Sequence, residues 1–476
     1  MFWTISFVLG LPLAQDLNEQ AERLYTNAGT FMAAGKYSEA LADLQKIVDS
    51  YHTTNWADKA LLEIGGYYLN VKNEPLTALQ YFTKIQDNYP ASESAPAAYY
   101  WKAFILDASA SGRSDLENAT ADLIRMLNLY SDHDWEDGAL FLLSRLGARL
   151  REYPQCLNHA QRLEFGFPGS RFVPAALLLS SRVAYLSGRD QEASLTLGRL
   201  QTRYSDSPEA ETAASYMAIL NRFSGPELSY QLDRNFPGSV PKKYKNPVRV
   251  GIAADGLVGI LDGSGVHFAT TGTPPTLRLN DPDSVTGFCV SPQGELLIVA
   301  EDRISRLDGR PVFSSLRVSG EGLRDISHAA IDHYNRVYVL DSDLKDVAVF
   351  DRNGSFLKLL QVPKATAVRV FEDSAWVLSG DGASIIEFGP QLERIGAVSS
   401  GLVNAEDFTL DPYGNIYALF DKGYKVAVFD HQKNVRAQLN LKAGSYPLKQ
   451  ADAIAVDQTG AIYLVDRRGG SVFRFH

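Results

Sequence analysis

The sequence has little cysteine, no excess of positive charge and no long apolar run beyond its N-terminus. Only Cys156 and Cys289 occur among 476 residues, which excludes a disulfide framework and a cysteine-based zinc site. Lys and Arg number 46 against 56 Asp and Glu, and the net charge of -10 disfavours nucleic acid and anionic membranes as partners. No later segment reaches the ~20 apolar residues of a membrane-spanning helix, so we expect no transmembrane segment.

The rest of the composition is that of a folded protein. Hydrophobic residues make up 45% of the chain and charged residues 21%, close to the averages for globular proteins. At roughly 100–200 residues per domain, the length predicts two or three domains.

The first fifteen residues form an uncharged, mostly apolar segment. We interpret residues 1–15 as a signal peptide cleaved after Ala14, which predicts a periplasmic or secreted protein. The segment lacks the usual positive charge, so the alternative stays open that it is the start of the first helix in a cytoplasmic protein. No cysteine lies near Ala14, which excludes a lipid-anchored lipoprotein.

Residues 16–223 carry a helical repeat. Aromatic residues end its successive units at intervals of 38, 41, 37 and 37 positions: Tyr51, Tyr89, Tyr130, Phe167 and Tyr204. Turn-forming residues follow several of them, so each unit is predicted to be a pair of helices. The pattern therefore predicts an α-helical solenoid of about five repeats. A final capping helix from Pro208 to Phe223 is expected to face solvent.

The second unit places small and aromatic residues where its two helices would meet. The pattern consists of Leu61, Ile64, Gly65 and Tyr68, followed by Ala78, Phe82, Ile85 and Pro90. It resembles the tetratricopeptide repeat (TPR), and the aromatic-Pro-Ser endings of the units resemble those of bacterial envelope TPR proteins. The resemblance implies a concave groove that binds peptides or partner proteins. We expect Gly65 to allow close helix contact, and Tyr68 and Phe82 to fill space toward the next pair.

Residues 224–247 interrupt the helical pattern. Prolines and the lysines Lys242, Lys243 and Lys245 gather there, so the segment is predicted to be a linker. From Val248 to His476 the pattern changes to short β-rich runs separated by Gly, Asp and Asn turns, which indicates an all-β domain.

This β domain repeats about every forty residues. The equivalent positions are Gly259, Leu297, Tyr338, Trp376, Tyr417 and Tyr463, spaced by 38, 41, 38, 41 and 46. Six such units predict a six-bladed β-propeller. Because the chain stops after the third strand of the sixth unit, we expect an N-terminal strand around Val240 to Val250 to complete that blade.

The repeat also has a recognisable motif. The clearest copies start at Asp332, Asp411 and Asp457, and two of them continue into Val347–Asp351 and Val426–Asp430. The pattern D-x-x-G-x-I-Y-V-x-D followed by V-x-V-F-D resembles the NHL-type propeller repeat. Its Asp and Gly are expected to form tight hairpin turns, with Gly or Asn at positive φ.

Polar residues where the innermost strands begin, and at the hairpin ends that face them, are the candidate binding residues. They would form a polar ring at the mouth of the propeller channel: Asp325, His328, Asp341, Glu406, Asp407, Asp452, Asp466 and Arg467. Only His328 supplies an imidazole at a strand start, so a multi-histidine metal site lacks ligands. Calcium at the acidic positions stays a less favoured alternative, and neither a catalytic motif nor a cofactor motif is present.

The sequence therefore predicts a multidomain protein, with an N-terminal TPR solenoid followed by a C-terminal six-bladed propeller. The predicted function is that of a non-catalytic scaffold or adaptor in the bacterial cell envelope. It would bind protein or peptide partners through the TPR groove and the propeller face. The alternative is a propeller hydrolase or lyase that acts at the channel mouth, with the TPR domain as recruiter.

Overall fold

The structure is a computed structural model that describes residues 10–131, 133–225, 228–237, 243–269, 276–277, 284–344, 346–442, 446–448 and 450–476. It divides into two compact units, Met1–Leu150 with Asn158–Phe172, and Arg151–Leu157 with Val173–His476. Residues 1–9 of the predicted signal peptide lie outside the described part, and the first helix begins at Gly10. None of the described helices is both long and apolar enough to span a bilayer.

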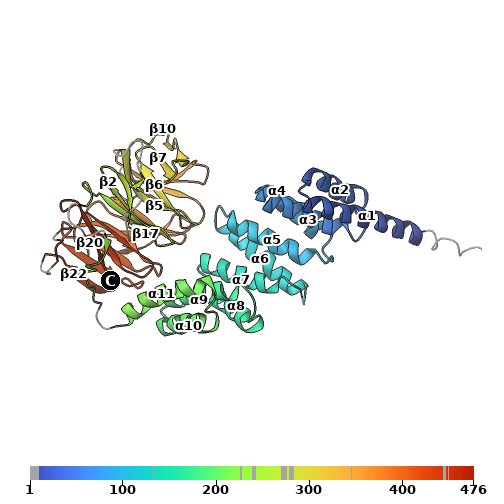
Figure 1. Cartoon of the computed structure of the whole chain (residues 1–476), viewed down its shortest axis with the longest axis horizontal. Coiled ribbons are helices and arrows are strands. Elements are labelled where there is room, and N and C mark those ends of the chain that lie inside the picture. Colours follow the sequence, from blue (N-terminus) through green and yellow to red (C-terminus); the bar gives the residue numbers. More distant parts are fainter. Residues whose placement is uncertain are drawn as a thin grey trace, which may run out of the picture. The chain divides into compact units, whose positions relative to one another are not determined.

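The N-terminal half of the described chain is helical, as predicted (Figure 1). Its helices are α1 (Gly10–Ala33), α2 (Tyr37–Ser50), α3 (Ala57–Asn70), α4 (Pro75–Asn88), α5 (Ala95–Ala108), α6 (Arg113–Leu129), α7 (Glu136–Arg149), α8 (Tyr153–Gly166), α9 (Val173–Leu186), α10 (Asp190–Arg203) and α11 (Pro208–Ser224). Each repeating aromatic residue directly follows the second helix of a pair, from Tyr51 after α2 to Tyr204 after α10. The 37–41-residue spacing therefore measures one helix pair, as the sequence predicted.

Close contact between paired helices depends on a glycine. A Cβ atom added to Gly65 on α3 would lie 2.6 Å from Cε1 of Phe82 on α4. Phe82 is completely buried, and it shares one hydrophobic cluster with Ala95 and Ile105 of α5. Phe82 thus packs within its own pair and also belongs to the core shared with the next pair, as expected. Tyr68 is partly buried and stacks on Tyr81, with ring centroids 5.5 Å apart.

The C-terminal half of the described chain is a six-bladed β-propeller, as predicted. Blade one holds β1 (Arg249–Ile252), β2 (Val258–Asp262), β3 (Gly265–Phe268) and β4 (Thr276–Leu277); blade two holds β5 (Val285–Val290), β6 (Leu296–Ala300), β7 (Arg303–Arg306) and β8 (Pro311–Ser314). Blade three holds β11 (Ile326–Ile331), β12 (Val337–Asp341), β13 (Val347–Phe350) and β14 (Phe356–Leu360). Blade four holds β15 (Ala367–Phe371), β16 (Ser374–Leu378), β17 (Ile385–Phe388) and β18 (Arg394–Val398). Blade five holds β19 (Ala405–Leu410), β20 (Ile416–Phe420), β21 (Lys425–Phe429) and β22 (Val435–Asn440), and blade six holds β23 (Ala453–Val456), β24 (Ile462–Asp466) and β25 (Ser471–Phe475).

Neighbouring strands within each blade are antiparallel, and blades two and three are connected through the short hairpin of β9 (Arg317–Val318) and β10 (Glu321–Gly322). The six equivalent positions found in the sequence all lie on the second strand of a blade. These strands are buried on both faces because neighbouring blades cover them; β12 and β20, for example, are buried at every residue.

The repeat motif is explained by a carboxylate that joins a hairpin turn to the second strand. Oδ1 of Asp332 accepts hydrogen bonds from the backbone N–H groups of Tyr334 and Arg336, and Oδ2 accepts one from the Tyr338 hydroxyl at 2.9 Å. Asn335 takes a φ of 57° in this turn. Buried tyrosine hydroxyls need an acceptor, and the Asp six residues earlier supplies it.

The other two clear copies have the same arrangement. The hydroxyl of Tyr417 donates to Asp411, and that of Tyr463 donates to Asp457, each at 3.1 Å. Gly414 and Gly460 take φ values of 76° and 75° in the corresponding turns. The predicted structural role of these Asp and Gly residues is therefore confirmed.

The sixth blade is completed by an N-terminal segment, but not by the predicted one. Leu232 forms an isolated antiparallel bridge with Phe475, and backbone hydrogen bonds join Gln231 to His476 and Asp233 to Arg474. The prediction of a strand around Val240 to Val250 was wrong: Val240, Pro241 and Lys242 lie outside the described residues, and Arg249–Ile252 forms the innermost strand of blade one instead. Its pairing with β2 leaves it unavailable for blade six.

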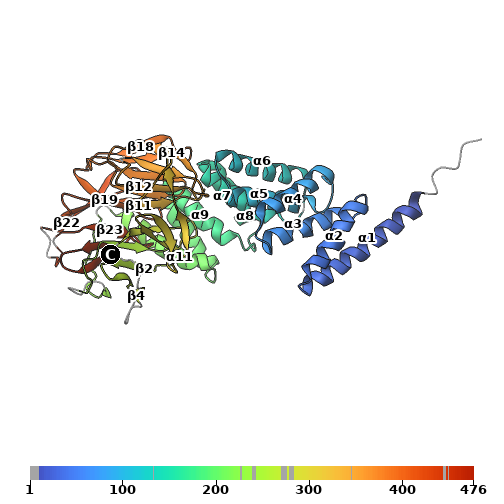
Figure 2. The ribbon, with the colours of Figure 1, turned by 90° about the horizontal axis from the view of Figure 1, so that it is seen from above.

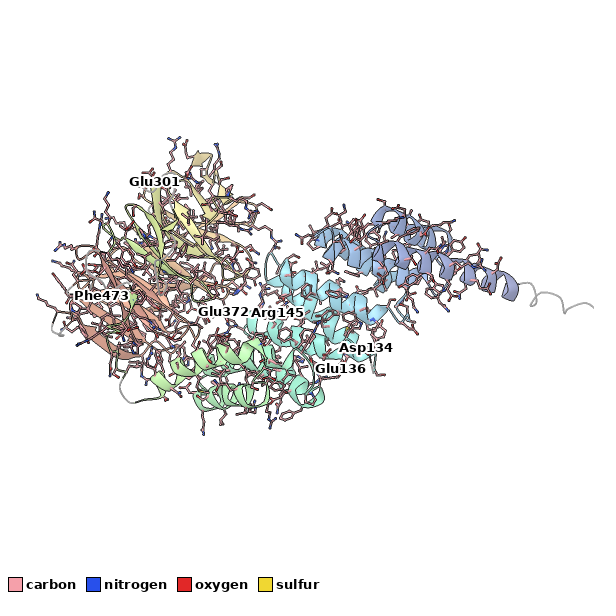
Figure 3. All side chains as sticks on the ribbon, in the orientation of Figure 1. Asp134, Glu136, Arg145, Glu301, Glu372 and Phe473 are labelled. Carbon is pink, nitrogen blue, oxygen red and sulfur yellow. The ribbon has the colours of Figure 1, made fainter. Side chains whose placement is uncertain are left out.

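The last three helices belong to the same compact unit as the propeller (Figure 2). On α9, the Ser181 hydroxyl hydrogen-bonds with that of Tyr413 at 2.8 Å, and the Tyr185 hydroxyl donates to Oδ1 of Asn415 at 2.8 Å. Arg182, also on α9, forms an ion pair of 3.0 Å with Glu372, which is labelled in Figure 3.

The final helix differs from the expected solvent-facing cap. On α11, the ring of Tyr216 packs edge-on against that of Tyr413, and the Arg222 guanidinium donates to the carbonyl of Gly460. The hairpin turns of blades five and six thus contact this helix, and Phe223 at its end is buried.

Candidate binding channel of the propeller

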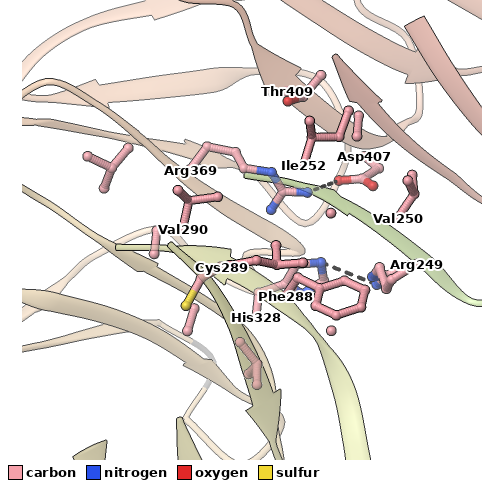
Figure 4. A pocket seen from close by; sticks show the side chains of 18 of the residues that line it. Arg249, Val250, Ile252, Phe288, Cys289, Val290, His328, Arg369, Asp407 and Thr409 are labelled. Atoms are coloured by element: carbon pink, nitrogen blue, oxygen red, sulfur yellow. Dashed lines mark hydrogen bonds and ion pairs between the residues drawn. The ribbon is translucent and has the colours of Figure 1, made fainter. Parts of the chain in front are cut away.

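The innermost strands of all six blades line a cavity of about 220 Å³ at the centre of the propeller (Figure 4). Apolar side chains such as Val250, Phe288 and Ile454 form part of its wall. The charged or titratable lining residues are Arg249, Cys289, His328, Arg369 and Asp407. The channel therefore combines apolar side chains with a few convergent charged groups, as ligand sites commonly do.

Arg249 and His328 form one polar pair in this channel. Nη2 of Arg249, on β1, lies 3.2 Å from Nε2 of His328 on β11. Burial, together with the charges of Arg249 and Arg369, holds the pKa of His328 well below its usual value. The imidazole is consequently neutral near pH 7. Since a guanidinium can only donate, Nε2 of His328 must be the acceptor and Nδ1 must carry the proton.

Arg369 and Asp407 form the second pair. Nη2 of Arg369, on β15, donates to Oδ1 of Asp407 on β19 at 2.8 Å. The same carboxylate accepts backbone hydrogen bonds from Phe408 and Ile454. Burial lowers the pKa of Arg369, the Asp407 carboxylate opposes this effect, and the charge of Arg249 adds to it. With His328 neutral, these four side chains carry two positive charges and one negative charge.

Cys289 is the remaining titratable group in the wall. It lies on β5, is 7% exposed, and has no disulfide partner. Burial raises the pKa of its thiol to about 12. The protonated thiol is a poor nucleophile, so Cys289 contributes apolar surface here.

The structure brings two of the eight predicted residues into the channel, His328 and Asp407. The other six do not line it: Asp325, Asp341, Glu406, Asp452, Asp466 and Arg467. Three of these carboxylates hold loop backbone instead. Asp341 accepts from the N–H groups of Arg324, Asp325 and Asp343, Asp452 accepts from that of Arg467, and Asp466 from that of Gly469.

Sequence reasoning missed the two arginines. Arg249 pairs with Leu261, as His328 pairs with Leu340 and Asp407 with Leu419, so these three residues occupy equivalent positions of different blades. Each of their partners on the second strand lies two residues after the repeating position of its blade, Gly259, Tyr338 or Tyr417. Applying this spacing to the first blade could have identified Arg249. In blade four the equivalent position is Ala367, and Arg369 lies two residues further along the strand, opposite Trp376. Among the residues that the structure describes, no three His, Cys, Asp or Glu side chains gather as a metal site would require.

No family model and no curated protein matches this sequence. Several solved structures are similar to part of the chain at low sequence identity. A structural genomics protein of unknown function from Bacteroides thetaiotaomicron is 14% identical over 51% of this chain and 72% of its own, with a TM-score of 0.39. The WD40 β-propeller domain of Doa1 is 13% identical over 52% of this chain and 96% of its own, with a TM-score of 0.38. A virginiamycin B lyase from Staphylococcus aureus is 12% identical over 50% of this chain and 82% of its own, with a TM-score of 0.36.

Proposed function

We propose that the protein is a non-catalytic adaptor, which binds a partner through its helices and an acidic group through its propeller channel. One observation carries this proposal. The channel presents the guanidinium of Arg249, whereas the two side chains in the channel that could accept a proton, His328 and Asp407, already accept hydrogen bonds. His328 accepts from Arg249, and Asp407 accepts from Arg369 and from two backbone N–H groups. Such an arrangement favours holding an anionic group over moving a proton.

The helices offer a second surface for the adaptor role. Tyr100, Trp101 and Phe104 of α5 form an aromatic cluster with Trp135, which directly precedes α7. Trp101 is partly exposed, and its ring centroid lies 5.6 Å from those of Phe104 and Trp135. Tryptophan and tyrosine are enriched at the centres of protein interfaces. In this proposal the helix pairs are of the TPR type and the blades are of the NHL type, supported by the Gly65–Phe82 contact and the Asp–Tyr turns.

The place of action in this proposal is the bacterial envelope, with residues 1–15 as an export signal. Its support is the uncharged apolar N-terminal sequence.

A capture experiment tests the adaptor proposal. The full chain, tagged at its C-terminus, is used as bait in envelope extract beside two variants, Trp101→Ala in the helices and Arg249→Met in the channel. We expect each variant to lose a different partner, while Arg310→Met at an exposed hairpin loses none. If neither variant changes the set of captured proteins, the proposal is wrong. The purified chain is then screened for hydrolase and lyase activity, with Asp407→Ala and His328→Ala as controls.

A further inference from the structure

We propose that the propeller channel binds a single carboxylate with a short apolar tail, and that Arg249 is the residue that holds the carboxylate. The inference rests on the proposed binding function of the channel and names the chemical class of its ligand. Three features of the site carry it: an arginine without a counter-ion among the described residues, an aromatic ring placed beside that arginine, and the size and lining of the cavity.

The first feature is the charge of Arg249. Within the described residues its guanidinium forms no ion pair, and its hydrogen bonds go to the carbonyl of Val248 and to His328, both at 3.2 Å. A guanidinium has five N–H donors, so most of them stay available. By contrast, Arg369 already has the Asp407 carboxylate as its partner. Among the described residues, one positive charge in the channel therefore has no counter-ion, which is suited to one anionic group.

Two buried nitrogen atoms without hydrogen-bond partners in the described part of the chain also indicate that an acceptor binds beside Arg249. Nε of Arg249 and Nδ1 of His328 are buried without a hydrogen-bond partner. Buried donors without an acceptor are uncommon in proteins because each loses its hydration without replacement. An acceptor that enters beside Arg249 would relieve this cost after a small rotation of the side chains. A carboxylate is suited to this role because its two oxygens match the fork of the guanidinium.

The second feature is a glycine that leaves room for the aromatic ring beside Arg249. At Gly287, the equivalent position of blade two, an added Cβ would be at ordinary contact distance from Cγ of Arg249, 3.6 Å, so this position does not depend on glycine. A Cβ on Gly251 would lie 2.7 Å from that of Phe288, so the ring of Phe288 depends on this glycine for its position in the wall. Figure 4 shows Phe288 beside the Arg249–His328 pair. Arg249 thus has the imidazole of His328 as a hydrogen-bond partner, with the ring of Phe288 nearby.

The third feature is the cavity itself. Its volume of about 220 Å³ is smaller than the roughly 300–1,000 Å³ of a pocket for a drug-sized ligand. Apolar side chains of four strands line part of it: Val250, Ile252, Phe288, Val290, Val370, Ile454 and Val456. A carboxylate with a few aliphatic carbons fits a small cavity in which apolar side chains adjoin an arginine.

Titration calorimetry on the full chain tests the inference, with sodium butyrate as probe and neutral butyramide as its isostere. It is carried out at low ionic strength because salt screens the attraction. We expect butyrate to bind one-to-one and butyramide not to bind. Arg249→Met should weaken butyrate binding about ten- to hundred-fold, as for loss of a charged hydrogen bond. The matched control Arg310→Met, at an exposed arginine that pairs with Asp308, should bind like the wild type.

Several outcomes would overturn the inference. They are equal binding of butyrate and butyramide, equal binding by the Arg249→Met variant, and competition by sulfate as strong as that by butyrate. Should Arg249→Met not fold, NMR of the wild-type chain decides. Butyrate, but not butyramide, must shift the imidazole resonances of His328, which lies 3.2 Å from the guanidinium. Absence of a shift at saturating butyrate contradicts the inference.

The carboxylate can come from a free small acid or from the end of a partner chain. A short peptide ending in valine with a free carboxylate, compared with its C-terminal amide, separates the two sources. Tighter binding of the peptide than of butyrate assigns a chain end, and the reverse order assigns a free acid. Failure of the capture experiment leaves this titration unaffected, so the adaptor proposal and the carboxylate site can fail independently.

Discussion

Two neighbouring glycines of α3 allow a direct test of the helix packing. Gly65→Ala places a methyl group 2.6 Å from the ring of Phe82, whereas Gly66→Ala places one where no atom lies within 4 Å. Both changes gain the same helix propensity, about 1 kcal/mol of Ala over Gly. Only the first overpacks a buried ring, which costs about 1–3 kcal/mol. The difference in unfolding free energy between the two variants therefore isolates the overpacking cost.

Thermal unfolding of the full chain, followed by circular dichroism at 222 nm, measures this difference because the signal comes mainly from helices. At about 2–4 °C per kcal/mol for a unit of this size, Gly65→Ala should melt roughly 2–12 °C below Gly66→Ala. A second change, Phe82→Leu, should restore part of the loss in the Gly65→Ala background by removing the ring. Equal melting temperatures of the two glycine variants would refute the role of Gly65 as the contact point of the pair.

Three further predictions concern the propeller. Tyr338→Phe removes the hydroxyl that donates to Asp332, and we expect a loss of about 1–3 kcal/mol in urea unfolding; an unchanged midpoint would contradict the proposed role of the repeat motif. Burial raises the pKa of Asp411 to about 6, so folding favours the protonated carboxyl. The stability that this protonated form contributes is fully present below pH 4 and is lost as the pH rises through 6. The wild type should lose roughly 3 kcal/mol between these limits relative to Asp411→Asn, and parallel pH profiles of the melting temperature would speak against this shift. Gln231→Pro removes the N–H that donates to the carbonyl of His476, and hydrogen exchange in β25 should become faster; unchanged protection would show that the bridge is not needed.

Periodicity made both halves of the fold predictable. The aromatic residues that end the helix pairs and the tyrosines of the second strands recur because each repeat packs against its neighbours in the same way. Their spacing can therefore be read from the sequence alone. The same logic located His328 and Asp407, which lie at equivalent positions of their blades.

The remaining channel residues could not be read in this way. Arg249 belongs to a degraded repeat, and a single arginine beside a linker is more often a solvated surface residue. Three of the expected carboxylates hold loop backbone, as Asp341 does with Arg324 and Asp325. An aspartate near a turn has the same sequence context whether it caps the turn or faces a ligand, so only the side-chain geometry separates these roles.

The pairing of Asp233 with Arg474 also limits how early the propeller can complete its folding during synthesis. The two residues lie 241 positions apart, and a ribosome adds about 5–20 residues per second, so the segment that completes blade six waits roughly ten to fifty seconds for its partner. The helices emerge long before, whereas the ring stays open until β25 has been translated. A nascent chain would thus expose unpaired strand edges of the open ring throughout this interval. A premature stop within β25 would prevent closure of the whole ring rather than remove one strand.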